Sequence, residues 1–448
     1  MISFVVFGAS GDLAAKKTFP ALFQLFKKKA IERDQFRIIG FARSNLSNAD
    51  FENIISMHSG EEQGSTVLKS FRQHSEYFRG NYSDKASFEK LNEKLKSYEE
   101  QDKSVLRIFY LAVPPSVFFD VCSNIHKTTY LPNNRTRIIV EKPFGMDYDS
   151  ADMIMNLPIM RFMNPGIDAM FNHEHVESVE IFMKESGTCE GREGYFNSNG
   201  VVRDVLQNHL MQLFSAVAMD PPRSADASDI RNAKVKLLQA AKPFRREDTL
   251  FGQYVKSADG SKKGYLDLKG IPEDSNTATF VASTLYVDNE RWKGVPFVFV
   301  TGKALNENDV HVSLHLRPKD MPYQSKGNQS RLVTFSIQPK EYVAFDCLIK
   351  RPTMAGGLHT AELKIDYDKD LEDVYQKYDA YEALFYDAIK GNPTRFVRSD
   401  EVEAGWRIVN NILDPKEPCE KYTFGSAGPK QLREYLHKYL YLETSKKT

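Results

Sequence analysis

A phosphate-binding turn is the first chemistry suggested by the residues near the N-terminus. In the stretch "FGASGDLAAKKTF", Gly8 and Gly11 follow an apolar run and Ala14 comes three residues later, a G-x-x-G-x-x-A spacing. Glycines there permit a tight turn and a close backbone approach, and the N–H groups of the next helix attract a pyrophosphate. We expect Ser10 and Asp12 to cap that helix. An ordinary strand–turn–helix connection is the alternative, but the position in a first βα turn favours a dinucleotide site.

The second apolar run, "FRIIGFARS", indicates which dinucleotide would bind. An NAD site usually places an acidic residue near the end of this strand, where it holds the ribose 2′-hydroxyl. Arg43 and Ser44 stand there instead. A guanidinium binds a 2′-phosphate through two hydrogen bonds, so we predict NADP as the cofactor. A solvated arginine that merely follows a strand is the alternative.

A lysine at the end of a later strand is the next candidate. "RIIVEKPFG" places Lys142 directly after an apolar run, at the edge of a parallel sheet where ligands bind. A single lysine at such a place is usually solvated. The glutamate before it and the "PFG" after it make Lys142 a candidate binding residue.

The elements that would position these residues form a parallel sheet. Apolar runs alternate with helical segments, the pattern of βαβ units, at Ile2–Phe7, Phe36–Phe41, Leu106–Val113 and Arg137–Val140. We therefore predict an α/β, Rossmann-like, doubly wound domain over residues 1–145. A chain of 448 residues exceeds what one hydrophobic core usually supports, so a second domain is expected.

Residues 146–448 have a different pattern. Strand-like segments with alternating faces follow one another, among them "VESVEIFMKES", "GVPFVFVTGKAL", "DVHVSLHLRP" and "RLVTFSIQP". Helical patterns bracket them at Gly200–Met219 and at Leu371–Lys390, the latter continuing over Glu401–Leu413. We predict a β+α domain with one large, mainly antiparallel sheet.

The composition of the chain argues against several classes of binding partner and site. Sixty basic and sixty acidic residues cancel, which argues against nucleic acid or an anionic membrane as the partner. The four cysteines lie far apart without C-x-x-C spacing, so we expect neither a zinc site nor disulfide bonds. We also expect the protein to act in the reducing cytosol. The cluster "HEH" (His173–His175) has no third spaced ligand, and we expect it to be loop surface rather than a metal site. The spacing of "HVSLH" places His311 and His315 on one strand face, where we expect core or surface packing. We read the apolar start as a strand, and no run reaches transmembrane length.

At this point the chain resembles the glucose-6-phosphate dehydrogenase family. The segments that carry the resemblance are "GASGDLA", "IVEKPFG", "EGREGYF", "VVRDVLQNHLMQLFSAVAMDPP", "DNERWKGVPF", "GKAL", "DAYEALFYDAI", "FVRSDEVEAGWRI" and "YTFGSAGP". The resemblance implies NADP-dependent oxidation of glucose 6-phosphate at C1. It also implies a homo-oligomer, a dimer or a tetramer, assembled through the large sheet.

The resemblance also implies roles for particular residues. His209 would be the general base that takes the C1 hydroxyl proton, and an imidazole suits this role because its pKa lies near working pH. Lys142 would touch both cofactor and substrate. The other positions that match sugar-phosphate contacts are Glu185, Asp204, Lys303 and Gln338. The cofactor positions are Gly8, Ala9, Ser10, Gly11, Asp12, Leu13, Arg43 and Phe118, the last in place of a family tyrosine.

One family segment is absent. The motif R-I-D-H-Y-L-G-K-E should follow "EKPFG", but only residues 146–156 separate Gly145 from "LPIMRFMNP". In the family this motif supplies the His, Tyr and Lys that bind the substrate phosphate, and the aspartate that orients the catalytic histidine. Asp204 is not expected to replace that aspartate, because on a regular helix it points about 140° away from His209.

Three interpretations of the gap stay open. In the first, the family reaction is the function and the sequence has lost an exon-sized piece through gene modelling or splicing. In the second, the chain is a catalytically inactive NADP-binding relative that pairs with an active one and regulates it. In the third, it is a dehydrogenase for an unphosphorylated aldose.

Overall fold

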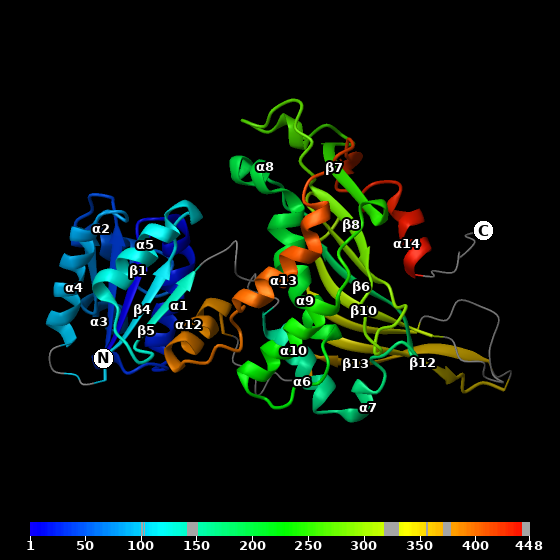
Figure 1. Cartoon of the computed structure of the whole chain (residues 1–448), viewed down its shortest axis with the longest axis horizontal. Helices are drawn as coiled ribbons and strands as arrows, with labels where there is room; N and C mark the ends of the chain where they lie inside the picture. The colour runs from blue at the N-terminus through cyan, green and yellow to red at the C-terminus, as the bar shows by residue number, and fades with distance from the viewer. Residues whose placement is uncertain are drawn as a thin grey trace. The chain divides into compact units, whose positions relative to one another are not determined.

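A computed structural model describes residues 1–99, 102, 104–140, 151–317, 331–354, 357–370 and 378–440. The chain divides into two compact units, one of Met1–Tyr148 with Lys377–Phe396 and one of Asp149–Gln376 with Val397–Thr448 (Figure 1). Lys142, a predicted ligand of both cofactor and substrate, lies outside the described residues. No helix in the described ranges is long and apolar enough to cross a membrane.

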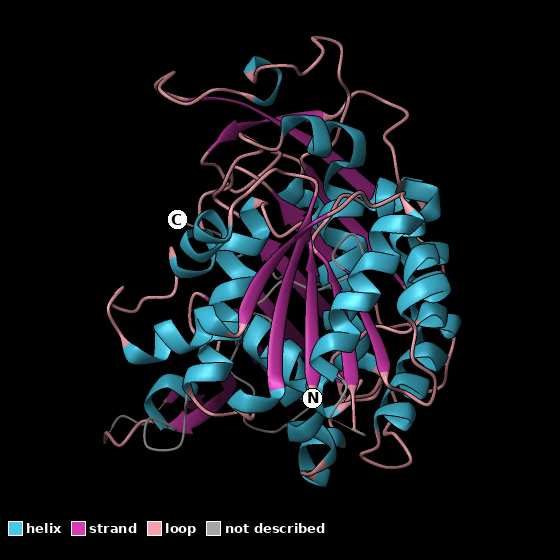
Figure 2. Cartoon of the chain, turned by 90° about the vertical axis from the view of Figure 1, so that its left-hand side faces the viewer, coloured by secondary structure: helices cyan, strands magenta, loops and turns pink. Residues whose placement is uncertain are grey.

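The first unit is the predicted Rossmann-like domain. Its five strands pair in parallel in the order β3-β2-β1-β4-β5. They are β1 (Ile2–Phe7), β2 (Phe36–Ala42), β3 (Ser75–Arg79), β4 (Leu106–Leu111) and β5 (Thr136–Val140). Helices cover both sides of this sheet (Figure 2), among them α1 (Phe19–Lys27), α2 (Asn48–Ser56), α3 (Thr66–Gln73), α4 (Lys85–Glu99) and α5 (Phe118–Asn124). The sequence analysis missed β3, since "SEYFR" is short and polar and forms an edge.

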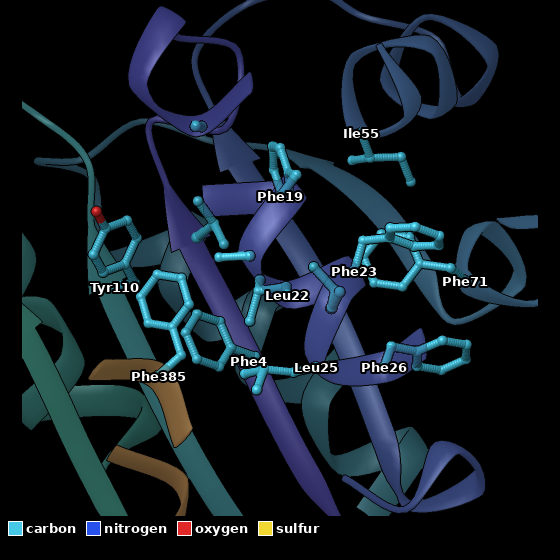
Figure 3. Packing of buried hydrophobic residues seen from close by; sticks show 14 of the residues in the cluster. Phe4, Phe19, Leu22, Phe23, Leu25, Phe26, Ile55, Phe71, Tyr110 and Phe385 are labelled. Carbon is cyan, nitrogen blue, oxygen red and sulfur yellow. The ribbon is translucent and has the colours of Figure 1, made fainter. Parts of the chain in front are cut away.

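The sequence of β1 from Phe4 to Phe7 is an uninterrupted apolar run because helices cover both faces of the first sheet. Phe4 and Val6 point into one hydrophobic cluster, and Val5 and Phe7 point into the other. Figure 3 shows the first cluster, in which α1 contributes Phe19, Leu22 and Phe23.

A helix from far along the chain completes this unit. Phe385 of α12 (Ala380–Lys390) contacts the rings of Phe4 and Tyr110 at centroid distances of 5.2 and 5.1 Å (Figure 3). The buried carboxylate of Glu382 pairs with Lys28 Nζ at 2.5 Å. From its position in the chain, this segment was predicted to belong to the second domain, residues 146–448. Its apolar face instead packs on the first sheet.

The second unit contains a nine-stranded sheet in the order β13-β12-β11-β10-β6-β9-β8-β7-β14. Its strands are β6 (Val176–Lys184), β7 (Thr249–Ser257), β8 (Phe280–Leu285), β9 (Phe297–Gly302), β10 (Asp309–Leu316), β11 (Leu332–Gln338), β12 (Tyr342–Lys350), β13 (Leu358–Asp366) and β14 (Glu420–Phe424). The predicted antiparallel arrangement is confirmed except at two pairs, β6 with β9 and β7 with β14, which are parallel.

Helices cover one face of the large sheet. They include α9 (Met211–Ala218), α10 (Ala227–Ala240) and α13 (Ser399–Val409), whereas α14 (Leu432–Leu440) lies on the opposite side (Figure 1). Before α9 comes η5 (Val202–Leu210), a π-helix with i→i+5 hydrogen bonds. Together η5 and α9 form the helix predicted at Gly200–Met219. The other described α-helices of this unit are α6 (Ala151–Phe162), α7 (Pro165–Asp168), α8 (Glu193–Val201) and α11 (Tyr367–Asp370).

Candidate active site

The glycine turn of the first unit has the geometry expected of a phosphate cradle. Gly8 has a φ of +83°, and a Cβ there would lie 2.1 Å from the carbonyl oxygen of Ala112, so only glycine fits. The N–H of Gly11 donates to the carbonyl of Gly8 at 2.8 Å, which closes the turn. The first N–H groups of the following helix have no intrahelical partner and are available to a ligand. The turn therefore fits a pyrophosphate.

The predicted caps of this helix are wrong. The Ser10 hydroxyl shares a 2.9 Å hydrogen bond with the Ser44 hydroxyl, and Asp12 pairs with Lys16 at 2.7 Å. In the described part of the chain, no side chain caps the turn that begins at Ala14. Ser10 instead ties the glycine turn to the loop that follows β2, where Arg43 lies.

Arg43 is placed to receive an anion. Its guanidinium lies 5.3 Å from the centre of the Tyr82 ring, and it has no hydrogen bond or ion pair with any residue that the structure describes. Phe118 begins α5 shortly after β4, at the same carboxyl edge of the sheet, where doubly wound folds bind ligands. A dinucleotide with an additional phosphate fits these three features, which are the glycine turn, the Arg43 guanidinium and the carboxyl ends of the strands.

In the second unit, the strand register brings Glu185, Lys303 and Gln338, three predicted substrate-binding residues, to the same end of the strands of the large sheet. We call this end of the strands the charged edge. Lys184, the last residue of β6, aligns with Gly302, the last residue of β9. The residues that follow them, Glu185 and Lys303, therefore lie at the ends of neighbouring strands. Val310 aligns with Met183 on one side and with Gln338 on the other. Gln338 thus ends β11 at the same edge.

Charged side chains meet at this edge. Lys303 Nζ lies 2.6 Å from Glu185 Oε2 and 3.7 Å from Asp204 Oδ2, and Lys303 and Asp204 are buried. Among the described residues, Lys303 is the ion-pair partner of Glu185 Oε2, and this oxygen has no further hydrogen-bond donor. Such a carboxylate oxygen can accept a hydrogen bond from a sugar hydroxyl.

The π-helix changes the expected relation between Asp204 and His209. Both side chains are buried in η5. Because i→i+5 bonding widens the turn, two residues five positions apart are separated by a smaller angle than the 140° of a regular helix. The Asp204 carboxylate itself pairs with Lys303 and, at 3.6 Å, with Arg192. The premise of a regular helix therefore does not hold for this segment.

Several residues that the sequence analysis did not select hold this edge in place. The buried Tyr422 hydroxyl donates to the carbonyl of Lys303 at 2.7 Å and contacts the Thr279 hydroxyl at 2.9 Å. Ala304 has a φ of +53°, an uncommon conformation for a residue with a Cβ and one that often marks functional sites. Arg192 and Tyr422 belong to the motifs "EGREGYF" and "YTFGSAGP", which were the only available signals.

Cys189 lies near the same charges but is not a nucleophile. Burial raises the pKa of its thiol to about 12, although Lys303 and a hydrogen bond with Tyr254 act in the opposite direction. A thiol with such a pKa stays protonated near neutral pH. The site therefore offers acid–base chemistry rather than covalent catalysis by cysteine.

Gly200 sets the direction in which η5 leaves α8. Its φ of 64° and ψ of 173° belong to a region that is essentially restricted to glycine, and Val201 then donates to the carbonyl of Ala278 at 3.0 Å. We expect Gly200→Ala to lower the free energy of unfolding by about 1–3 kcal/mol, measured by urea denaturation. Gly194→Ala in α8 is the control, since a Cβ there meets nothing within 4 Å. Equal stability of the two variants would contradict this explanation.

The histidines of "HVSLH" take part in a charged network on β10. His311 Nδ1 lies 2.9 Å from Asp309 and Nε2 lies 3.3 Å from Glu180 of β6, while His315 Nε2 lies 3.5 Å from Glu180. Burial alone would lower the pKa of His311, but the bonds to Asp309 and Glu180 outweigh it and raise the pKa to about 9. No cluster of three metal-ligating side chains occurs among the residues described.

This network makes stability depend on pH. Because the folded-state pKa of His311 is raised from 6.5 to about 9, its stabilisation is complete below pH 6.5 and is lost as pH rises through 9. We expect His311→Gln to cost about 1–3 kcal/mol of unfolding free energy at pH 6 and much less at pH 9.5. Urea denaturation at both pH values measures this, with the exposed His126→Gln as the control. A loss of the same size at both pH values would contradict the argument.

Comparisons with known proteins bear on both units. A family model described as "Glucose-6-phosphate dehydrogenase, NAD binding domain" matches residues 5–164, and one described as "Glucose-6-phosphate dehydrogenase, C-terminal domain" matches residues 158–441. A solved structure described as "Glucose-6-phosphate dehydrogenase in complex with its substrate glucose-6-phosphate" is 35% identical, with a TM-score of 0.92, and covers 100% of this chain and 98% of its own. A glucose-6-phosphate 1-dehydrogenase structure from Mycobacterium avium is 27% identical, with a TM-score of 0.83, covering 97% of this chain and 96% of its own.

Two yeast proteins show how the chain compares in length. "Probable glucose-6-phosphate 1-dehydrogenase C7.13c" of Schizosaccharomyces pombe is 43% identical and covers 98% of this chain and 99% of its own. The Saccharomyces cerevisiae glucose-6-phosphate 1-dehydrogenase is 38% identical, with coverage of 98% and 94%. The first alignment has 473 positions, 25 more than the 448 residues of this chain, so at least 25 positions have no residue here.

Proposed function

Because the chain belongs to the glucose-6-phosphate dehydrogenase family, we propose that it oxidises glucose 6-phosphate at C1, with NADP as the hydride acceptor. The observation that carries the proposal is the charged edge of the large sheet, where Glu185, Lys303 and Asp204 meet. A sugar has many hydroxyls and few charges. Carboxylates that are held by one buried lysine can accept hydrogen bonds from those hydroxyls and fix the orientation of the ring.

His209 has the role of general base. When bound, NADP supplies an acceptor for the hydride that leaves C1. The C1 hydroxyl must lose its proton in the same reaction, and a neutral imidazole takes a proton efficiently near neutral pH. Burial of His209 keeps water away from the site of proton transfer. Lys303, drawn toward Glu185 and Asp204, offsets the charge of the two carboxylates before the substrate binds.

The missing motif bears on how well the chain performs this reaction. The 25 or more alignment positions without a residue in this chain support a loss of residues relative to the Schizosaccharomyces pombe protein, whether in the gene or in the transcript. The lost residues would include those for the substrate phosphate and the aspartate that orients His209. We therefore propose that the chain retains the NADP site and the sugar-binding edge and turns over glucose 6-phosphate slowly.

One experiment tests this proposal against the two alternatives. NADPH formation is followed by absorbance with the purified chain, NADP and either glucose 6-phosphate or glucose. Turnover with glucose 6-phosphate supports the family reaction. Turnover with glucose alone supports an aldose dehydrogenase. No turnover with either sugar, in a folded protein that still binds NADP, supports an inactive relative.

We propose further that the chain acts in the cytosol as a homo-oligomer assembled through the large sheet. All four cysteines are free thiols, which suits a reducing compartment. The paired strands β12 and β13 expose the apolar side chains Leu348, Ile349, Leu363 and Ile365. Exposed apolar patches often mark protein interfaces. Light scattering that found only monomer at micromolar concentration would refute the assembly.

A further inference from the structure

A second arginine lies beside the predicted 2′-phosphate position. Arg79 is the last residue of β3 and pairs in register with Ala42, the last residue of β2. Its guanidinium donates to Asn45 Oδ1 at 3.2 Å. Asn45 directly follows Arg43 and Ser44, so Arg79 reaches the loop in which the predicted cofactor residue lies.

Neither arginine is neutralised by a carboxylate among the residues described. Among the residues described, the Arg43 guanidinium lies against the ring of Tyr82, and the Arg79 guanidinium donates to the neutral amide of Asn45. The nearby acids have other partners, since Asp12 pairs with Lys16 and Glu76 pairs with Lys94 at 2.7 Å. Two uncompensated guanidinium groups at the end of adjacent strands attract a doubly charged anion.

Hydroxyl groups complete this site, and the loop that holds them is fixed. Ser10 and Ser44 share a hydrogen bond of 2.9 Å, so both hydroxyls face the same space. The Tyr77 hydroxyl donates to the carbonyl of Ser44 at 2.6 Å and holds the loop backbone in place. Guanidinium groups and hydroxyls are the donors that recognise a phosphate monoester.

We infer that Arg79 binds the ribose 2′-phosphate of NADP together with Arg43, and that the pair sets the preference of the chain for NADP over NAD. This inference rests on the proposed cofactor site. A phosphate monoester carries about two charges at neutral pH, and a single arginine neutralises only one of them. Arg79 supplies the second charge from a neighbouring strand, where no motif around the glycine turn would reveal it.

Calorimetric titration of the full chain with NADP and with NAD tests the inference without turnover. We expect Arg79→Gln to weaken NADP binding by about tenfold or more, the effect of one charge-assisted hydrogen bond, and to leave NAD binding unchanged. Arg43→Gln should do the same. Arg37→Gln is the matched control, since Arg37 lies near the opposite end of β2 against Tyr98 and should change neither affinity.

The outcomes separate the inference from the cofactor site on which it rests. If the unaltered chain binds NADP no better than NAD, or if Arg43→Gln has no effect, the proposed site itself is wrong. If Arg43→Gln loses the preference while Arg79→Gln keeps it, only the role of Arg79 is overturned. Equal weakening of NADP and NAD by Arg79→Gln would also overturn it, because that pattern indicates damage to the fold. Unchanged NAD affinity shows that a variant is folded.

Discussion

Replacing His209 by asparagine is expected to lower NADPH formation from glucose 6-phosphate by about 10² to 10⁴-fold. Asparagine has a similar size and can keep a hydrogen bond, but it cannot take a proton from the C1 hydroxyl. Because His209 is buried in the π-helix η5, whose backbone holds it in place, the shape of the site should persist. The affinity for NADP, measured by calorimetry, should stay the same.

Two controls make this result specific. His126→Asn changes an exposed histidine of the first unit and should leave the rate unaltered. Thermal unfolding of both variants shows whether the fold survives. If His209→Asn turned over at the unaltered rate, another group would be the base, and the role of His209 would be wrong.

Restoring the missing segment is expected to have the largest effect. The change inserts, between Met146 and Leu157, the corresponding residues of the 43% identical Schizosaccharomyces pombe relative. An aspartate that orients a catalytic histidine is worth about 10⁴ in rate in comparable sites. Each restored charge-assisted contact to the substrate phosphate adds about 1.5–3 kcal/mol of binding. We therefore expect kcat/KM for glucose 6-phosphate to rise by about 10⁴-fold or more.

A matched insertion isolates the chemistry from the change in length. The control segment has the same number of residues, but alanine replaces the aspartate, histidine, tyrosine and lysine of R-I-D-H-Y-L-G-K-E. It should leave kcat/KM close to that of the 448-residue chain. A rise of equal size with both segments would mean that the insertion merely repairs the fold. No rise with either would mean that the chain does not use the family site.

The first sheet and its glycine turn were predictable because their causes are local. Phe4 to Phe7 read as one apolar run since helices cover both faces of β1. Gly8 has to adopt a positive φ beneath Ala112, and only glycine does so easily. Four of the five strands of the first unit were found in this way. β3 was not predicted, because a strand at the edge of a sheet needs no continuous apolar run.

Other features depend on contacts that the order of residues does not reveal. The helix α12 belongs to the first unit because Phe385 packs on Phe4 and Tyr110, more than 250 residues earlier. The π-helix η5 reads as an ordinary helix, since both kinds of helix use the same residue types. That difference of geometry reduces the angle between Asp204 and His209 from the value expected for a regular helix. Arg79 gains its proposed role only through the pairing of β3 with β2.

The most direct test of the central claim follows the hydrogen at C1. Glucose 6-phosphate carrying deuterium at C1 is incubated with the purified 448-residue chain and NADP, and NADPH is analysed by mass spectrometry. This readout detects even the slow turnover expected without the missing motif. We predict that deuterium appears in NADPH and that His209→Asn slows its transfer by about 10² to 10⁴-fold. Absence of deuterated NADPH after long incubation, in a chain that binds NADP, would contradict the proposed reaction.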